Sequence, residues 1–119
     1  MKLNHLNLTV TDVAAAKQFL ETYFGLKSAE GAEDRKSFAV LFDDNGMVLT
    51  LMKAGATTEV KYPGFFHIGF IQESEERVNE IYQRLSDDGF AVAPPQRSHA
   101  TIPTTRPAQN RRVASAAAL

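Results

Sequence analysis

The stretch Leu3-Asn4-His5-Leu6-Asn7-Leu8-Thr9-Val10 decides the fold, because its outline returns 62 residues later as Phe65-Phe66-His67-Ile68-Gly69-Phe70. In the first copy apolar and polar side chains alternate, and this period of two is typical of a β-strand with one face in the core. Each copy carries a histidine at the equivalent position, on the face opposite the apolar one. We therefore predict two related strands, over residues 2–10 and 65–71.

A helix is predicted after each of these strands. After the first strand, Thr11 or Asp12 can cap a helix that carries an apolar stripe and ends at Gly25. After the second strand, Ser74 caps a helix with acidic residues in its first turn, and Asp88-Gly89 ends it. Strand, histidine, helix and glycine stop recur in the same order, which indicates a duplicated module.

The first copy continues into a hairpin. Two β-prone runs, residues 37–42 and 47–53, flank the turn Asp43-Asp44-Asn45-Gly46. Asn-Gly between such runs is a strong local indication of a hairpin. A polar stretch precedes the first run, and a linker at residues 54–64 follows the second. The first copy is thus a βαβββ module, and a period near 60 residues suits a duplicated module better than a solenoid repeat.

The second copy does not complete this pattern. Residues 1–90 carry all 14 acidic side chains and nine of the 13 basic ones, whereas the remainder carries four arginines and no acid. The part from Thr101 onward has no alternation and no hairpin indication, and it is rich in Pro, Thr, Arg and Ala. Such a segment buries too little apolar area to offset its ordering entropy.

We therefore predict one domain over residues 1–95, with modules at 1–55 and 64–95, and an atypical basic tail at 96–119. The tail is expected to be disordered or loosely attached. A frameshift or a recombined cassette would explain it, and the final Ala116-Ala117-Ala118-Leu119 resembles a vector-derived addition.

The composition excludes several classes of protein. A length of 119 residues suits a single domain. No apolar run approaches the ~20 residues that span a bilayer, and the absence of cysteine excludes disulfides, thiolate metal sites and cysteine nucleophiles. We expect a cytoplasmic protein. Nucleic-acid binding is not expected. The net charge is −1, and the arginines of the tail form no motif and have no aromatic residues between them. These arginines are Arg97, Arg106, Arg111 and Arg112.

The paired histidines are candidate metal ligands. In a pseudo-symmetric sheet the faces of His5 and His67 would converge on one cavity, where neutral imidazoles suit Zn, Fe or Ni and also occur with Mn. Alternatively each is a half-buried strand residue with a hydrogen-bond partner. A competent site also needs a carboxylate, which the module places on its last strand. Thr50 stands there in the first copy, and no acid follows Asp88. His99 is either a replacement ligand or an exposed loop residue.

These features resemble the vicinal oxygen chelate superfamily, which includes glyoxalase I, fosfomycin-resistance proteins, extradiol dioxygenases and bleomycin-resistance proteins. The resemblance rests on the opening strand at residues 3–10, on Asp12, and on the helix end Phe19…Tyr23-Phe24-Gly25-Leu26. It covers residues 1 to about 95. It implies an α+β fold in which two βαβββ modules form a U-shaped mixed sheet around a small-molecule cavity. The second module is incomplete here.

The resemblance also implies a ligand set. In metal-dependent members a histidine on the first strand and another on the fifth bind the metal, and these positions match His5 and His67. A glutamate on the eighth strand completes the set, and glyoxalase-like members add a glutamate on the fourth strand, where Thr50 stands. The chain therefore departs from both the four-ligand and the three-ligand patterns.

Two functions of different classes follow. In the first, a divalent metal (Zn, Mn, Fe or Ni) acts as a Lewis acid on a substrate with vicinal oxygens, in lyase-, isomerase- or dioxygenase-like chemistry. In the alternative, a non-catalytic small-molecule or drug-binding protein contacts its ligand without metal through Asn7, Thr9, Thr50 and Phe65. A cassette-borne protein with no retained activity is a third interpretation.

A homodimer is expected in either case. Loss of two strands from the second module would expose a sheet edge that proteins normally cover or pair. Strands or modules from a partner chain would complete the sheet, for example by domain swapping.

Overall fold

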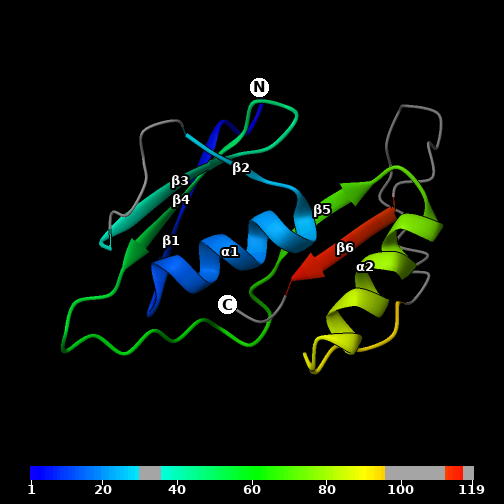
Figure 1. Cartoon of the computed structure of the whole chain (residues 1–119). Coiled ribbons are helices and arrows are strands. Elements are labelled where there is room, and N and C mark those ends of the chain that lie inside the picture. Colours follow the sequence, from blue (N-terminus) through cyan, green and yellow to red (C-terminus); the bar gives the residue numbers. More distant parts are fainter. Residues whose placement is uncertain (30–35, 96–111, 117–119) are drawn as a thin grey trace. The chain divides into compact units, whose positions relative to one another are not determined.

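The computed structural model describes residues 1–29, 36–95 and 112–116 (Figure 1). The chain divides into two compact units, the first over Met1–Phe66 and the second over His67–Ala118. The helices and strands in chain order are β1 (His5–Val10), α1 (Val13–Phe24), β2 (Lys27–Ser28), β3 (Phe38–Phe42), β4 (Val48–Lys53), β5 (Ile68–Gln72), α2 (Glu75–Asp87) and β6 (Arg112–Ala116).

The first unit contains a mixed four-stranded sheet in the order β1-β4-β3-β2. β1 runs parallel to β4, whereas β3 pairs antiparallel with both β4 and β2. Helix α1 packs on one face of this sheet against β3 and β4. β1 begins at His5, three residues after the start that the sequence predicted.

Helix α1 begins and ends where the sequence predicts. Asp12, one of the two candidate caps, accepts a hydrogen bond from the Ala15 backbone N–H at 3.0 Å. Gly25 ends the helix in the left-handed conformation, with a φ of 69°, which is accessible to glycine at little cost. Four helix residues are buried against the sheet: Val13, Ala16, Leu20 and Tyr23.

The predicted hairpin is confirmed. β3 and β4 pair in register from Phe38↔Met52 to Phe42↔Val48. Asp43 orders the connecting turn, because its Oδ1 accepts hydrogen bonds from the backbone N–H groups of Asn45 at 2.9 Å and Met47 at 2.7 Å. A short strand that the sequence analysis did not assign, β2, adds to the outer edge of β3.

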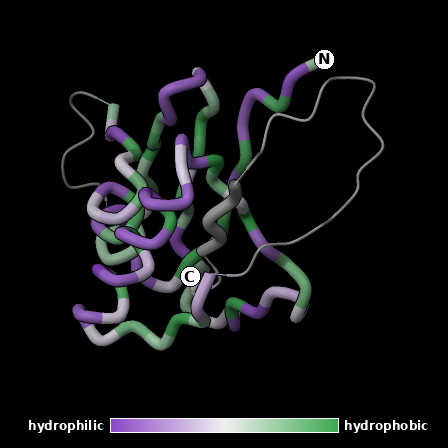
Figure 2. Tube along the Cα trace, turned by 90° about the vertical axis from the view of Figure 1, so that its right-hand side faces the viewer, coloured by the Kyte–Doolittle hydropathy of each residue, from purple (hydrophilic) through white to green (hydrophobic). Residues whose placement is uncertain are grey.

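The core of the first unit comes from alternate strand positions. Leu8, Leu41, Leu49 and Leu51 are all buried. Buried positions therefore alternate with more exposed ones along β1, β3 and β4, and hydrophobic residues recur all along the trace in Figure 2. This alternation places the buried side chains on the face of the sheet that α1 covers. The side chains of the other face do not contribute to this core.

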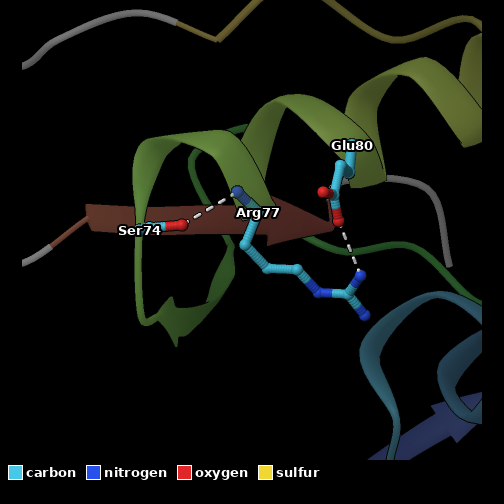
Figure 3. Close-up of polar contacts among 3 residues, drawn as sticks. All are labelled: Ser74, Arg77 and Glu80. Carbon is cyan, nitrogen blue, oxygen red and sulfur yellow. Dashed lines mark hydrogen bonds and ion pairs between the residues drawn. The ribbon is translucent and has the colours of Figure 1, made fainter.

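The second unit contains α2 and the antiparallel pair β5–β6. Ser74 caps α2 as predicted, since its Oγ accepts from the Arg77 N–H at 3.1 Å, and Arg77 pairs with Glu80 at 2.9 Å (Figure 3). Ile81 and Leu85 form the buried face of the helix. β5 begins at Ile68, three residues later than the predicted strand.

The sequence analysis assigned no strand to residues 112–116, which form β6. In the antiparallel pair, β5 residues from Ile68 to Gln72 face β6 residues from Ala116 to Arg112. Disorder was predicted for the whole tail, residues 96–119, but residues 112–116 form β6 by pairing with β5; the remainder of the tail, residues 96–111 and 117–119, lies outside the described residues. The α+β class is confirmed. The module boundaries at 1–55 and 64–95 and the U-shaped sheet stay predictions.

Within the described residues, no helix combines the length and apolar character that crossing a membrane requires.

Candidate functional site

The face of the four-stranded sheet turned away from α1, here called the open face, carries the predicted polar residues of β1. Leu8 and Val10 are buried on the helix side of this strand. His5, Asn7 and Thr9 occupy the alternate positions and are exposed. Because successive side chains of a strand point to opposite faces, these three residues line the open face together, as the alternation predicts.

The register between β1 and β4 adds Thr50 to this set. Asn7 is the partner of Thr50 on the neighbouring strand, and Thr50 is in turn the partner of Val40 on β3. Register partners lie on the same face, about 4.8 Å apart. The Asn7 amide and the Thr50 hydroxyl therefore form an adjacent pair of hydrogen-bonding groups in the middle of the open face.

On β3 and β4, the open face is apolar except at Thr50. The register places alternate residues of β3 on this face, together with the β4 residues two positions before and after Thr50. Met52 is 48% exposed and Phe42 is 37% exposed, and the others are half-buried. The open face thus has a polar part on β1 and Thr50 and an apolar part made by Phe38, Val40, Phe42, Val48 and Met52.

The imidazole of His5 is oriented by its neighbour. Nδ1 of His5 lies 3.2 Å from Oδ1 of Asn4. A carboxamide oxygen only accepts hydrogen bonds, so this contact suits the tautomer with the proton on Nδ1; in the neutral imidazole, that tautomer carries its lone pair on Nε2. Nε2 is the atom that can accept a hydrogen bond from a ligand or bind a metal.

His67 and Phe65 lie on either side of the boundary between the units. His67 precedes β5 and is exposed. In β5, Ile68 and Phe70 are half-buried, whereas Gly69 and Ile71 are exposed, so the strand presents an uncovered face of its own. His67 continues the exposed series. Phe65, in the first unit, is 96% exposed. The convergence of His5 and His67 on one cavity stays a prediction, because they belong to separate units.

The described residues do not complete a metal ligand set. Among residues 1–29, 36–95 and 112–116, no three His, Asp or Glu side chains gather closely enough to hold a metal ion. The open face offers an imidazole, an amide and hydroxyls, but its β4 position carries Thr50 where a carboxylate would serve. His5 fits as a single ligand, and the donor set around it does not fit a bound metal. His99 lies outside the described residues.

Tyr62 was missed by the sequence analysis, which assigned it to a linker. Its hydroxyl accepts from the Thr9 N–H at 2.9 Å and donates to the Thr9 carbonyl oxygen at 2.7 Å. The two residues are 53 positions apart, so no local pattern could reveal the contact. An aromatic residue beside the Pro63-Gly64 turn was the one feature that marked this position.

Comparison with known proteins places these features in a family. The model of the Glyoxalase/Bleomycin resistance protein/Dioxygenase superfamily matches residues 2–104. The structure of a possible glyoxalase from Bacillus cereus is 54% identical, with 81% of each chain covered and a TM-score of 0.73. No curated protein matches the chain.

Two further structures share the fold at lower identity. A solution structure of a protein from Agrobacterium tumefaciens is 20% identical, over 83% of this chain and 81% of that one, with a TM-score of 0.63. The oxidase ChaP-H2 is 21% identical, over 75% of this chain and 63% of that one, with a TM-score of 0.51. At these identities the likeness concerns the fold alone.

Proposed function

Because the chain belongs to the glyoxalase/bleomycin resistance protein/dioxygenase superfamily, we propose that it binds a small organic molecule on the open face of its first sheet. The observation that carries this proposal is the pairing of Asn7 with Thr50 beside the apolar residues of β3. A hydrogen-bonding edge next to an apolar floor is the usual composition of a small-molecule site, where a few polar groups orient a mostly apolar ligand.

The ligand in this proposal is uncharged. Among the strand residues that the structure describes, one charged residue, Lys27, lies on the open face. Its position follows from the register, in which Lys27 is the partner of Phe42. Lys27 is in β2, the outer strand of the sheet, and its Nζ lies 3.9 Å from Oδ1 of Asp44. Asn7, Thr9 and Thr50 offer neutral donors and acceptors only. An anionic ligand would lose its hydration without gaining a charged partner, which is unfavourable.

The spacing of the strands sets the orientation of the ligand. β1 and β3 are separated by two strand spacings, or about 10 Å. A flat molecule of roughly bicyclic size would place its apolar body over Val40 and Phe42 and direct a hydroxyl or carbonyl group to Asn7 and Thr50. His5 Nε2 would accept a hydrogen bond from the same edge.

Two probes with the same ring system test the proposal. 2-Naphthol is uncharged at neutral pH, whereas 2-naphthoate is an anion. We expect 2-naphthol to raise the melting temperature by mass action and 2-naphthoate to raise it less at equal concentration. Asn7→Leu and Thr50→Val should each weaken the effect of 2-naphthol. Gln18→Leu, an exposed change on α1, is the matched control and should retain it.

The proposal fails if 2-naphthoate stabilises the protein more than 2-naphthol does. It fails equally if Gln18→Leu weakens the response as much as Asn7→Leu, because the probe would then bind elsewhere or indiscriminately. Chemical-shift mapping of the Asn7 and Thr50 amides locates the bound probe directly.

Metal-dependent chemistry is a second candidate, favoured by the exposed imidazole of His5 and by the 54% identity to a structure described as a possible glyoxalase. In this version His5 and His67 would be two of the ligands of a divalent metal. The described residues do not supply the remaining ligand.

Elemental analysis of the purified protein separates the two candidate functions. Stoichiometric Zn, Mn, Fe or Ni that is lost in His67→Ala favours the enzyme, whereas metal-free protein that binds 2-naphthol favours the binding protein.

A further inference from the structure

The turn between β3 and β4 contains a reactive dipeptide, Asn45-Gly46, and Asn45 is the one asparagine of the chain that precedes a glycine. The side chain of an asparagine can be attacked by the backbone nitrogen of the next residue, and a side chain on that residue shields the nitrogen. Glycine has no Cβ, and a Cβ at Gly46 would meet no atom within 4 Å. The Asn45 carboxamide is thus followed by an unshielded backbone nitrogen.

The side chain of Asn45 is also open to water. Asp44, Asn45 and Gly46 are all exposed. Within the part of the chain that the structure describes, the Asn45 carboxamide has no hydrogen-bond partner. No side-chain contact of Asn45 with these residues therefore has to break before the carboxamide reacts, and water reaches it directly.

Asp43 holds the backbone on both sides of Gly46. Its Oδ1 accepts hydrogen bonds from the Asn45 N–H at 2.9 Å and from the Met47 N–H at 2.7 Å. The N–H of Asp43 donates to the Met47 carbonyl oxygen at 3.2 Å. Hydrogen bonds to a carboxylate are stronger than those between neutral groups. These contacts, here called the Asp43 clamp, fix the conformation of the turn around Gly46.

We propose that Asn45 is a site of spontaneous deamidation and that the Asp43 clamp sets the rate. The Gly46 nitrogen loses its proton to hydroxide and attacks Cγ of Asn45, so that an N–Cγ bond forms. The Cγ–Nδ2 bond then breaks, and the leaving nitrogen takes a proton from water and departs as ammonia. Water opens the resulting cyclic succinimide at either carbonyl. The product at position 45 is aspartate or isoaspartate, and the overall change consumes one water and releases one ammonia.

The clamp controls this reaction through the backbone. Ring closure brings the Gly46 nitrogen to bonding distance from Cγ of Asn45, which requires rotation of the peptide between these two residues. That rotation moves the Met47 N–H relative to the Asn45 N–H, and the same Oδ1 of Asp43 accepts from both. The clamp must therefore open before the ring closes. Asp43 slows the reaction in the folded protein and has no such effect in the unfolded chain.

Deamidation alters the end of the hairpin. Isoaspartate adds one carbon atom to the main chain, within a turn that closes on the register pair Phe42↔Val48. Either product also adds a carboxylate next to Asp43 and Asp44, and like charges at this separation repel one another. The modified protein therefore has a less stable turn at the end of the open face where Phe42 and Val48 lie. This consequence holds whatever ligand the open face binds.

Ageing of the purified protein in mildly alkaline buffer, followed by tryptic digestion and mass spectrometry, tests the site. Residues 37–53 form one tryptic peptide, in which Asn45 is the only amide side chain. A mass gain that corresponds to replacement of NH₂ by OH therefore reports on Asn45 alone. We expect this gain in the wild type and its loss in Asn45→Gln, because the longer side chain must close a less favourable ring. An equal rate in the peptide that contains Asn4 and Asn7 would overturn the proposal.

Asp43→Ala and Asp44→Ala separate the clamp from the local charge. Each removes one carboxylate close to Asn45, but the clamp belongs to Asp43. A hydrogen bond of ordinary net strength corresponds to about a fivefold change in an equilibrium constant. We therefore expect deamidation to become at least about fivefold faster in Asp43→Ala and to stay close to the wild-type rate in Asp44→Ala. Asp43→Ser, which retains a neutral acceptor, should react at an intermediate rate.

The same measurements in urea show whether the effect depends on the folded turn. We expect the wild type, Asp43→Ala and Asp44→Ala to react at similar rates once the chain is unfolded. Equal acceleration by the two alanine variants in the folded protein would overturn the role of the clamp. So would a faster reaction of Asp43→Ala that persists in urea. If neither the wild type nor Asp43→Ala is deamidated at Asn45, the site itself is refuted.

Discussion

Asn7 on β1 and Thr50 on β4 are direct register partners, and both side chains lie on the sheet face turned away from α1. On the opposite face, the next pair along the same strands is Leu8↔Leu51, and both leucines are buried. One parallel strand pair thus supplies a core contact beneath the helix and a pair of hydrogen-bonding groups on the open face. The core contact holds the strands in register, and this register places the amide beside the hydroxyl.

Leu20→Ala should strongly destabilise the protein. Leu20 is 1% exposed, on the face of α1 that packs against the sheet. Truncating a buried leucine costs about 2–5 kcal/mol of unfolding free energy, through lost burial and the cavity that remains. Urea denaturation measures this change. Leu3→Ala, at a position that is 70% exposed, is the control and should change the free energy by less than about 0.5 kcal/mol.

Gly25→Ala should destabilise the protein through its backbone alone. Gly25 has a φ of +69°, and a Cβ at this position would meet no atom within 4 Å. The expected cost is therefore the strain of a left-handed alanine, about 1–2 kcal/mol. Gly64→Ala provides the comparison, because that site is equally open without a positive φ. If both substitutions cost the same in thermal denaturation, backbone strain is not the cause.

Thr50→Glu should create a better metal site than the wild type has. The new carboxylate would stand beside Asn7 and two register positions from His5, the next residue of β1 on the same face. Carboxylate and imidazole together suit Zn²⁺. We expect a gain in Zn²⁺ affinity on the order of tenfold, or 1.4 kcal/mol, by isothermal titration calorimetry. Thr22→Glu, exposed on α1, should give no gain, and an equal gain there would indicate nonspecific binding.

The protein should form a homodimer in solution. Tyr62 covers the outer backbone groups of Thr9, but the edge of β1 also includes His5 and Asn7, both exposed among the described residues. Strand edges of this kind are usually paired or covered, and a second copy can supply the strand. Light scattering during size-exclusion chromatography should give twice the chain mass of 13.1 kDa. A monomer at micromolar concentration would contradict this prediction.

Much of the first unit was predictable from local patterns. The alternation around Asn7 placed His5, Asn7 and Thr9 on one face, and the capping residues Asp12 and Gly25 bounded α1. Membership of the superfamily, predicted from the opening strand and helix, is confirmed by the family model over residues 2–104. These predictions succeeded because alternation and capping depend on residues only a few positions apart.

The short strand β2 was not predictable in the same way. It comprises two residues in a polar stretch, and their sequence has no strand pattern. Pairing with Phe42 and Leu41 of β3 defines them as a strand, and Ser28 also donates a hydrogen bond to Glu21 on α1. β6 likewise owes its assignment to pairing with β5, since alanine and arginine do not favour strands on their own.

The sequence by itself determined the alternation of β1, the helix boundaries, the β3–β4 hairpin and the family. Each depends on side-chain period, capping or turn geometry within a short segment. Only the tertiary structure decided that Thr50 stands beside Asn7 and that Tyr62 closes the edge of β1 at Thr9. Both contacts join residues more than 40 positions apart. The first depends on the register of a parallel strand pair and the second on the path of the connector after β4, and no local pattern encodes either.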